Sequence, residues 1–228
     1  GGRRQGGVAG EAALAGAKGV RGGDVAGRPC AVIEPMSVGF HAVARGEVTD
    51  NCYVMVIGCG MVGLGAVVRA ATRGAVVIAA DIDDEKLALA KEVGANYTIN
   101  TIGEDVHQRM QEITGGLGAD VVIEAVGSPT TYVMAVNEVS FTGRVVCIGY
   151  AKSEVAFQTK LFVQKELDIR GSRNATPSDF RAVINCINKG AFDLEKFISK
   201  VVKPEEAIDA MKEWSKHPGK VFRILVEM

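Results

Sequence analysis

The chain has 228 residues, of which 47% are hydrophobic and 23% charged. This composition supports a packed core and excludes a disordered protein. The 26 Lys and Arg residues nearly balance the 27 Asp and Glu residues, so the charge predicts no surface for nucleic acid or an anionic membrane. No apolar run reaches the roughly 18 residues of a membrane span. We therefore expect neither nucleic acid nor a membrane as a partner.

The thiols and imidazoles form no recognisable local metal site. The three histidines fall in no His-Glu-x-x-His pattern, and no two cysteines form a Cys-x-x-Cys pair. An odd number of scattered cysteines within apolar segments indicates reduced thiols and a cytoplasmic protein. These cysteines are Cys30, Cys52, Cys59, Cys147 and Cys186.

Residues 1–30 differ in composition from the rest of the chain. They contain ten glycines and four arginines but no aromatic residue, Ile or Met, and no hydrophobic period is readable. We expect a disordered leader outside the fold, with a folded element as the alternative. The Arg content also suits an organellar transit peptide, but the absence of Ser argues against one.

From residue 31 onward, apolar strands alternate with helices. The patterns predict helices at 31–45, 61–71, 84–93, 104–113, after Pro129, at 177–187 and at 204–214, and strands at 53–57, 75–80, 97–99, 121–123, 144–148, 167–170 and 221–226. Near-continuous Val/Ile strands, most of them followed by helices, are typical of a parallel sheet covered on both faces. We predict an α/β fold with a doubly wound parallel sheet (Rossmann), with residues 31–175 as the nucleotide-binding domain and residues 176–228 as a helical and strand segment that completes it.

A glycine-rich turn directly follows the first strand. Gly58, Gly60 and Gly63 have the spacing of a dinucleotide-binding turn that closes a strand and opens a helix. Gly58 permits the tight turn, Gly60 lets the backbone approach a pyrophosphate, and Gly63 lets the helix and strand pack closely. The helix that begins near Met61 would direct free N–H groups at the phosphates. Cys59 is interpreted as a small filler.

Asp81 completes the fingerprint at the end of the second strand. It lies 23 positions after Gly58, close to the roughly 20 residues expected for the acid that binds the adenosine ribose. Residues 82–85 are also acidic or apolar and include no Arg to hold the extra phosphate of NADP. The sequence therefore predicts NAD as the cofactor. The alternative for Asp81 is an ordinary turn former at the strand end.

The carboxyl ends of the later strands should line the same crevice, because ligands bind there in open sheets of this type. This places three short groups at the cofactor: Ala125, Val126 and Gly127; Ile148, Gly149 and Tyr150; and Ser172 and Arg173. Arg173 is alternatively a surface cation.

Five segments in order resemble the medium-chain, zinc-type alcohol and polyol dehydrogenases, with sorbitol, threonine and sugar-acid dehydrogenases as the nearest branch. They are IEPMSVG at 33–39, VIGCGMVG at 56–63, DVVIEAVG at 120–127, GRVVCIG at 143–149 and GKVFR at 219–223. The resemblance runs from about residue 31 to the C-terminus. It implies that the chain is the NAD-binding portion, with remnants of the segments that face the catalytic domain.

The resemblance also assigns individual residues. It implies NAD contacts at Gly58, Gly60, Met61, Val62, Gly63, Leu64, Asp81, Lys86, Ala125, Val126, Ile148, Gly149, Tyr150, Ser172, Arg173 and Arg223. Lys86 would lie near the adenosine ribose, and Arg223 near the pyrophosphate unless it is a surface strand cation. Glu34 matches a position near the catalytic zinc, directly or through water; the alternative is an acid favoured at a helix N-terminus. His41 is interpreted as a packed helix residue.

Two zinc motifs of the family have no counterpart here. The chain has no Gly-His-Glu segment and no closely spaced cysteines, so we assign no catalytic residue and expect that this chain alone does not hold zinc. The leader does not resemble the family either, and its bias would fit a chance reading frame from GC-rich DNA.

The leading hypothesis is the NAD-binding part of an oxidoreductase that oxidises a secondary alcohol, polyol or sugar acid by zinc-assisted hydride transfer to NAD. The alternative is a catalytically inactive NAD-binding module or truncated remnant. A methyltransferase or flavoprotein with the same turn is disfavoured by the later segments. A small alcohol or polyol is the expected substrate, and a homodimer is consistent with the family.

Overall fold

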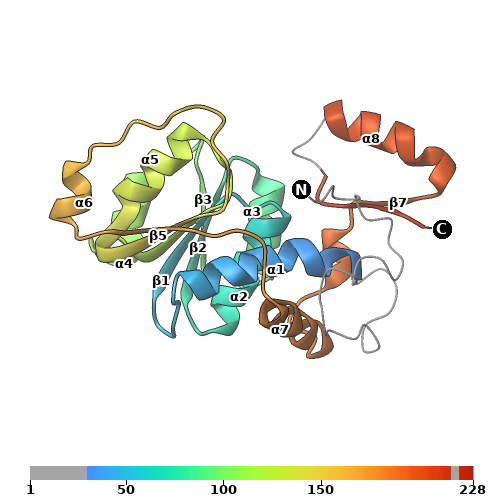
Figure 1. Cartoon of the computed structure of the whole chain (residues 1–228), viewed down its shortest axis with the longest axis horizontal. Helices are drawn as coiled ribbons and strands as arrows, with labels where there is room; N and C mark the ends of the chain where they lie inside the picture. The colour runs from blue at the N-terminus through green and yellow to red at the C-terminus, as the bar shows by residue number, and fades with distance from the viewer. Residues whose placement is uncertain (1–29, 217–220, 228) are drawn as a thin grey trace.

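The computed structural model describes residues 30–216 and 221–227 (Figure 1). The predicted leader lies outside these residues, apart from Cys30. Six parallel strands form the main sheet in the order β3-β2-β1-β4-β5-β6. They are β1 (Tyr53–Ile57), β2 (Val76–Asp81), β3 (Tyr97–Asn100), β4 (Ala119–Glu124), β5 (Val139–Cys147) and β6 (Asp168–Gly171). The strand order reverses between β1 and β4, which confirms the predicted doubly wound sheet.

Alternate residues of the central strands point into two separate cores. Val54 and Val56 pack with the helices α1 and α2, whereas Met55 and Ile57 pack on the opposite face with α4 and α5. Both faces are therefore covered, which is why these strands are apolar at consecutive positions. The helices are α1 (Cys30–Arg45), α2 (Met61–Thr72), α3 (Asp84–Glu92), α4 (Val106–Thr114), α5 (Pro129–Glu138), α6 (Lys160–Gln164) and α7 (Pro177–Asn188).

Side-chain caps fix where several helices begin. Asp83 accepts hydrogen bonds from the first turn of α3, and Asp105 does the same for α4. The cap at Asp105 explains why α4 begins at Val106, two residues after the predicted start. A capping box between Ser128 and Thr131 opens α5.

The C-terminal part forms a second, smaller unit beside the sheet (Figure 1). Its parallel strands β7 (Lys200–Val202) and β8 (Ile224–Val226) pair with each other, and α8 (Ala207–Lys216) covers them. The short helices η3 (Leu194–Phe197) and η4 (Pro204–Glu206) flank β7. The prediction of one helix at 204–214 was wrong in detail, because the first turn is a separate 3₁₀ segment.

Two strands begin three or more residues away from their predicted starts. The last strand begins at Ile224, not at residue 221, and β5 begins at Val139 instead of residue 144. The pairing of β4 with β5 shifts register between Ala119 and Val121, so β5 includes an irregular stretch that the apolar pattern does not reveal. Among the described residues, no helix is long and apolar enough to cross a membrane.

Candidate functional site

The glycine-rich turn lies between β1 and α2, where the strand order reverses. Gly58 has φ +93°, a conformation that side chains rarely adopt, and a β-carbon at Gly63 would overlap the carbonyl oxygen of Gly58. Gly60 is exposed and has open space around it, and as the N-cap of α2 it has no side chain to cap the first turn. The first N–H groups of α2 are therefore available for an anion, as in a phosphate-binding helix N-terminus.

Asp81 is buried at the end of β2 and points at this turn. Its Oδ2 accepts a hydrogen bond from Cys59 N at 2.6 Å, and its Oδ1 accepts from Ile82 N at 2.8 Å and Asp83 N at 3.1 Å. A carboxylate offers about four acceptor positions, and three are filled here. The carboxylate thus links the turn after β1 to the end of β2, and a further position remains for a ribose hydroxyl.

Cys59 and Lys86 lie next to this carboxylate. Burial raises the pKa of the Cys59 thiol well above its usual range; the Asp81 carboxylate adds to this and the Lys86 ammonium opposes it. A thiol with so high a pKa stays protonated, so Cys59 behaves as the small filler that the sequence indicated. Lys86 is half-buried in the first turn of α3, on the adenosine side of the predicted site.

The loops after β4 and β5 meet beside the glycine-rich turn. A β-carbon at Gly58 would contact the Val126 side chain, and Ala125 N donates to Ile57 O at 2.9 Å. The backbones of Gly127 and Gly149 are in close contact. Val126 and Tyr150 are 52% and 76% exposed, so this edge presents apolar surface to solvent. The structure therefore brings the first two predicted groups together with Gly58.

Ser172 and Arg173 follow β6 at the same edge of the sheet. Ser172 N donates to Cys147 O at 2.9 Å, and its Oγ is buried with no hydrogen-bond partner among the described residues. A buried hydroxyl of this kind is available to a ligand. Arg173 is exposed.

Arg223 and Glu34 both lie near the first residues of α1. Arg223 Nη2 donates to Ala31 O at 3.0 Å, and Glu34 is exposed on α1, directly before Pro35. His41, farther along α1, is half-buried, with Nδ1 3.0 Å from Asp179 Oδ2 on α7. This contact agrees with its interpretation as a packed helix residue.

Zinc does not fit the donor set of the described residues. They contain no group of three or more His, Cys, Asp or Glu side chains placed to hold a metal ion. A catalytic zinc usually takes three protein ligands, and Glu34 alone does not supply them. The four cysteines whose side chains the structure describes are free thiols: Cys52, Cys59, Cys147 and Cys186.

Sequence reasoning missed three residues that shape the loop after β4. Glu124, Thr131 and Tyr132 make side-chain hydrogen bonds that join this loop to α5 and to the loop after β5. The readable signal is Glu124 itself, an ionisable residue at the end of an apolar strand.

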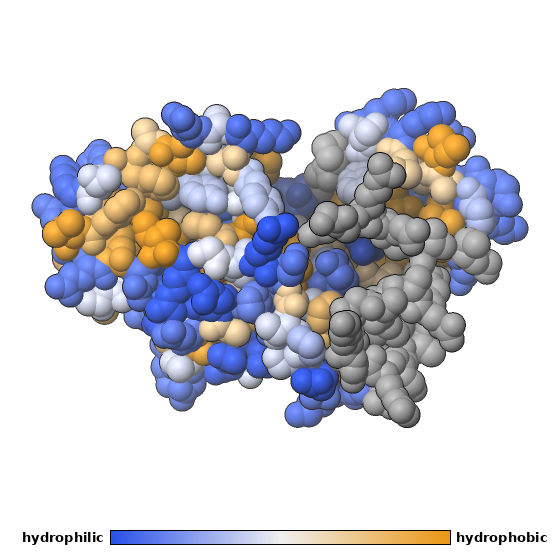
Figure 2. Space-filling view, in the orientation of Figure 1, coloured by the Kyte–Doolittle hydropathy of each residue, from blue (hydrophilic) through white to orange (hydrophobic). Residues whose placement is uncertain are grey.

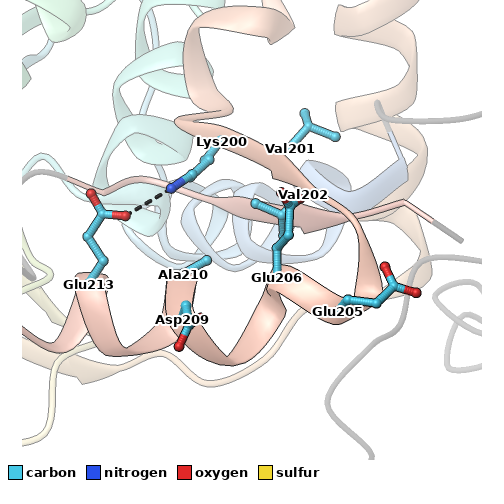
Figure 3. Close-up of a pocket in the computed structure, with 8 residues that line it drawn as sticks. All are labelled: Lys200, Val201, Val202, Glu205, Glu206, Asp209, Ala210 and Glu213. Atoms are coloured by element: carbon cyan, nitrogen blue, oxygen red, sulfur yellow. Dashed lines mark hydrogen bonds and ion pairs between the residues drawn. The ribbon is translucent and has the colours of Figure 1, made fainter.

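A cavity of about 420 Å³ lies elsewhere, between β7 and α8 (Figure 3). Four of its eight lining residues are acidic, and its one lysine, Lys200, donates to Glu213 at 2.9 Å. This negative lining would repel a pyrophosphate, so the cavity does not suit a dinucleotide. Its acidic residues are Glu205, Glu206, Asp209 and Glu213.

A comparison with models of known protein families finds a match to a family of dehydrogenases. The model of the zinc-binding dehydrogenases matches residues 61–189, which include Gly63 at the end of the glycine-rich turn and all strands from β2 to β6. The match begins at the first residue of α2 and ends just after α7.

Individual relatives are dehydrogenases. The chain is 35% identical over 175 residues to an erythritol/L-threitol dehydrogenase of Mycolicibacterium smegmatis, covering 76% of this chain and 48% of the relative. It is 32% identical over 191 residues to an uncharacterized zinc-type alcohol dehydrogenase-like protein of Haemophilus influenzae, covering 84% and 56%. The chain spans about half the length of these relatives.

A solved structure shares the fold. The crystal structure of a short chain alcohol dehydrogenase from Escherichia coli, complexed with NADH, superimposes with a TM-score of 0.81. Its sequence is 27% identical, and the match covers 90% of this chain and 61% of that chain.

Proposed function

The chain belongs to the zinc-binding dehydrogenase family, and from this premise we propose that it is the NAD-binding part of an oxidoreductase that oxidises a secondary alcohol, polyol or sugar acid. The observation that carries the proposal is the bond between Asp81 and Cys59 N, which joins the two halves of the dinucleotide fingerprint at the point where the strand order reverses. Bound NAD supplies the hydride acceptor of such a reaction.

Each part of the site has a distinct task in holding the cofactor. The N–H groups at the start of α2 bind the pyrophosphate, while Asp81 accepts from the adenosine ribose and Lys86 lies beside it. The loops after β4, β5 and β6 form the nicotinamide side. The proposed contacts there are Ala125, Val126, Ile148, Gly149, Tyr150, Ser172 and Arg173; Arg223 is assigned to the pyrophosphate side.

The remaining reaction components belong to the complete enzyme. Zinc would stabilise the alkoxide of the substrate, and Glu34 is proposed as its acidic neighbour where other residues supply the ligand set. We also propose a cytoplasmic location, consistent with the four free thiols. Within the chain, residues 31–175 form the NAD-binding domain and residues 176–228 complete it; the burial of Val183 and Ile184 in the core that contains α1 supports this division.

A homodimer through the edge of the sheet is also proposed. Among the strands that the structure describes, β6 has a neighbour on one side only, and Ile169 within it is 47% exposed. Phe141 and Val163 are 69% and 79% exposed, and Figure 2 shows hydrophobic patches over the region of α5 and α6. Light scattering of the wild type and of Ile169→Lys tests this: the wild type should have twice the chain mass and the variant the mass of one chain. A wild type with the mass of one chain contradicts the dimer.

NADH binding is the direct test of the cofactor site. Titration followed by NADH fluorescence should show saturable binding, and Asp81→Ala should weaken it by about tenfold or more, because a charged acceptor of ribose hydroxyls is lost. Asp209→Ala is the matched control, since Asp209 lies in the acidic cavity. Absence of binding by folded wild-type protein would refute the cofactor site.

Metal analysis with a panel of polyols separates the enzyme from the alternative, an inactive NAD-binding module. The donor set predicts less than stoichiometric zinc and no turnover by this chain alone. Stoichiometric zinc with turnover would show that the chain itself contains a complete active site.

A further inference from the structure

Glu124 is the last residue of β4 and is fully buried. It follows the run Val121, Val122 and Ile123, which are fully buried as well. An acidic side chain in such surroundings is costly unless it is hydrogen-bonded. Its partners therefore show what the residue does.

One oxygen of Glu124 organises the loop that follows it. Glu124 Oε1 accepts hydrogen bonds from Val126 N at 3.0 Å, from Gly127 N at 2.8 Å and from Thr131 Oγ1 at 2.7 Å. Thr131 in turn belongs to the capping box with Ser128 that opens α5. The loop after β4 is thus folded around a single carboxylate oxygen.

The same residue fixes the loop after β5. The backbone oxygen of Glu124 accepts from Ile148 N at 2.9 Å and from Gly149 N at 3.2 Å. Tyr132 Oη donates to Gly149 O at 2.6 Å from the first turns of α5. Both loops that form the nicotinamide side of the proposed site therefore take their shape from Glu124 and its neighbours.

The second carboxylate oxygen of Glu124 differs from the first in its hydrogen bonding. Oε2 is buried and has no hydrogen-bond partner among the described residues. The carboxylate also acts on its surroundings: burial raises the pKa of Cys147 to about 11, and Glu124 adds to this rise. A buried oxygen without a hydrogen-bond partner is unfavourable for stability. Natural proteins break the rule that buried polar groups are hydrogen-bonded mainly at functional sites.

We propose that Glu124 is a positioning residue for the nicotinamide half of NAD. By holding Val126 N and Gly127 N, it fixes the exposed Val126 side chain and the adjoining Gly149–Tyr150 backbone as one surface beside the glycine-rich turn. The inference rests on the proposed function and extends it to a residue that does not itself touch the cofactor.

The test compares NADH with ADP-ribose, which lacks the nicotinamide ring, by calorimetric titration of the full chain. Glu124→Met keeps the side-chain length but removes the acceptor, and should raise the Kd for NADH about tenfold while changing that for ADP-ribose less than about twofold. Glu124→Gln retains an acceptor oxygen and should restore NADH binding to within about threefold of the wild type.

Glu138→Gln is the matched control. Glu138 is a buried glutamate at the other end of α5, 3.1 Å from His107 Nδ1, and its replacement should change neither Kd. Where Glu124→Met does not fold, Thr131→Val serves in its place, because it removes one donor to Oε1 and should weaken NADH binding alone by about threefold.

Three results with the variants overturn the inference. The first is that Glu124→Met weakens the binding of NADH and of ADP-ribose equally, which would indicate a general structural role. The second is that Glu124→Met binds NADH as tightly as the wild type, and the third is that Thr131→Val leaves NADH binding unchanged. A folded wild type that binds ADP-ribose but not NADH overturns it too, whereas a wild type that binds neither ligand refutes the proposed function itself.

Discussion

The six-stranded sheet and the C-terminal unit of β7, β8 and α8 bury their apolar residues to very different degrees. Ile78 and Ile123 in the sheet are fully buried, whereas Ile208, Met211 and Trp214 on α8 are 67%, 61% and 42% exposed. The sheet gains its packing from helices on both faces, while α8 lies beside two strands of only three residues each. The proposed NAD site is built on the region whose geometry is fixed on both sides.

Truncation of one isoleucine in each region tests this contrast most strongly. Ile78→Ala should lower the free energy of unfolding by about 2–5 kcal/mol, because it opens a cavity between β2 and the helices. Ile208→Ala should lower it by less than about 0.5 kcal/mol, because its side chain is already largely exposed. Urea denaturation of both variants gives the comparison, and equal losses would contradict it.

The tight packing of the sheet should extend to its carboxyl edge, where Cys147 ends β5. Burial, with Glu124 adding to it, raises the pKa of this thiol to about 11. At pH 8 roughly 0.1% of such a thiol is ionised, compared with roughly a quarter of a free cysteine. Only the thiolate reacts with iodoacetamide. Alkylation of Cys147 should therefore be about a hundredfold slower than alkylation of the glutathione thiol, and it should accelerate as the pH rises toward 11.

Mass spectrometry of the peptide that contains Cys147 measures this rate. Alkylation at pH 8 as fast as that of glutathione would mean that the edge is open to solvent. Urea-unfolded protein provides the reference, since its cysteines should react at the rate of free thiols.

Replacing one carboxylate in each region, Asp81 at the sheet and Asp209 in the C-terminal unit, tests how the site selects NADH over NADPH. The wild type should bind NADPH at least about tenfold more weakly than NADH, because Asp81 repels the additional phosphate. Asp81→Ser should reduce this ratio severalfold, and Asp209→Ser should leave it unchanged, since Asp209 lines the cavity under α8. Fluorescence titration with both nucleotides measures the ratio; an unchanged ratio in Asp81→Ser would remove Asp81 from the selection of NAD.

The smallest effect is expected at the ion pair of the C-terminal unit. Lys200 and Glu213 are 50% and 65% exposed and lie 2.9 Å apart. Lys200→Met should change the free energy of unfolding by less than about 1 kcal/mol, and the change should shrink in high salt. A loss above that range in thermal or urea denaturation would show that the pair stabilises this unit more than its exposure indicates.

The main strands were predictable because their apolar runs are continuous and sharply bounded. The prediction at 53–57 coincides with β1, and Asp81 lies at the end of β2 as expected. The short elements were missed for the opposite reason: α6 has five residues and β7 has three, too few for a period to be read. In β5 the positive φ of Thr142 and the register shift against β4 interrupt the pattern.

The candidate site also has features that the sequence predicted and features that it did not. The spacing of Gly58, Gly60 and Gly63 predicted their geometry because each requirement acts within a few residues. The roles of Glu124 and the burial of Ser172 depend on which groups the fold brings together, so no spacing rule could reveal them. The nucleotide contacts themselves stay predictions for binding experiments.

The bond from Cys59 N to Asp81 has a consequence for how fast a ligand can bind. Because the turn after β1 is already tied to β2, its backbone loses conformational freedom during folding and has little left to lose on association. Binding to such a preorganised turn needs no slow rearrangement of the loop, so association should follow a single fast phase. Variants that break this bond should therefore have a lower association rate constant as well as a higher dissociation rate constant.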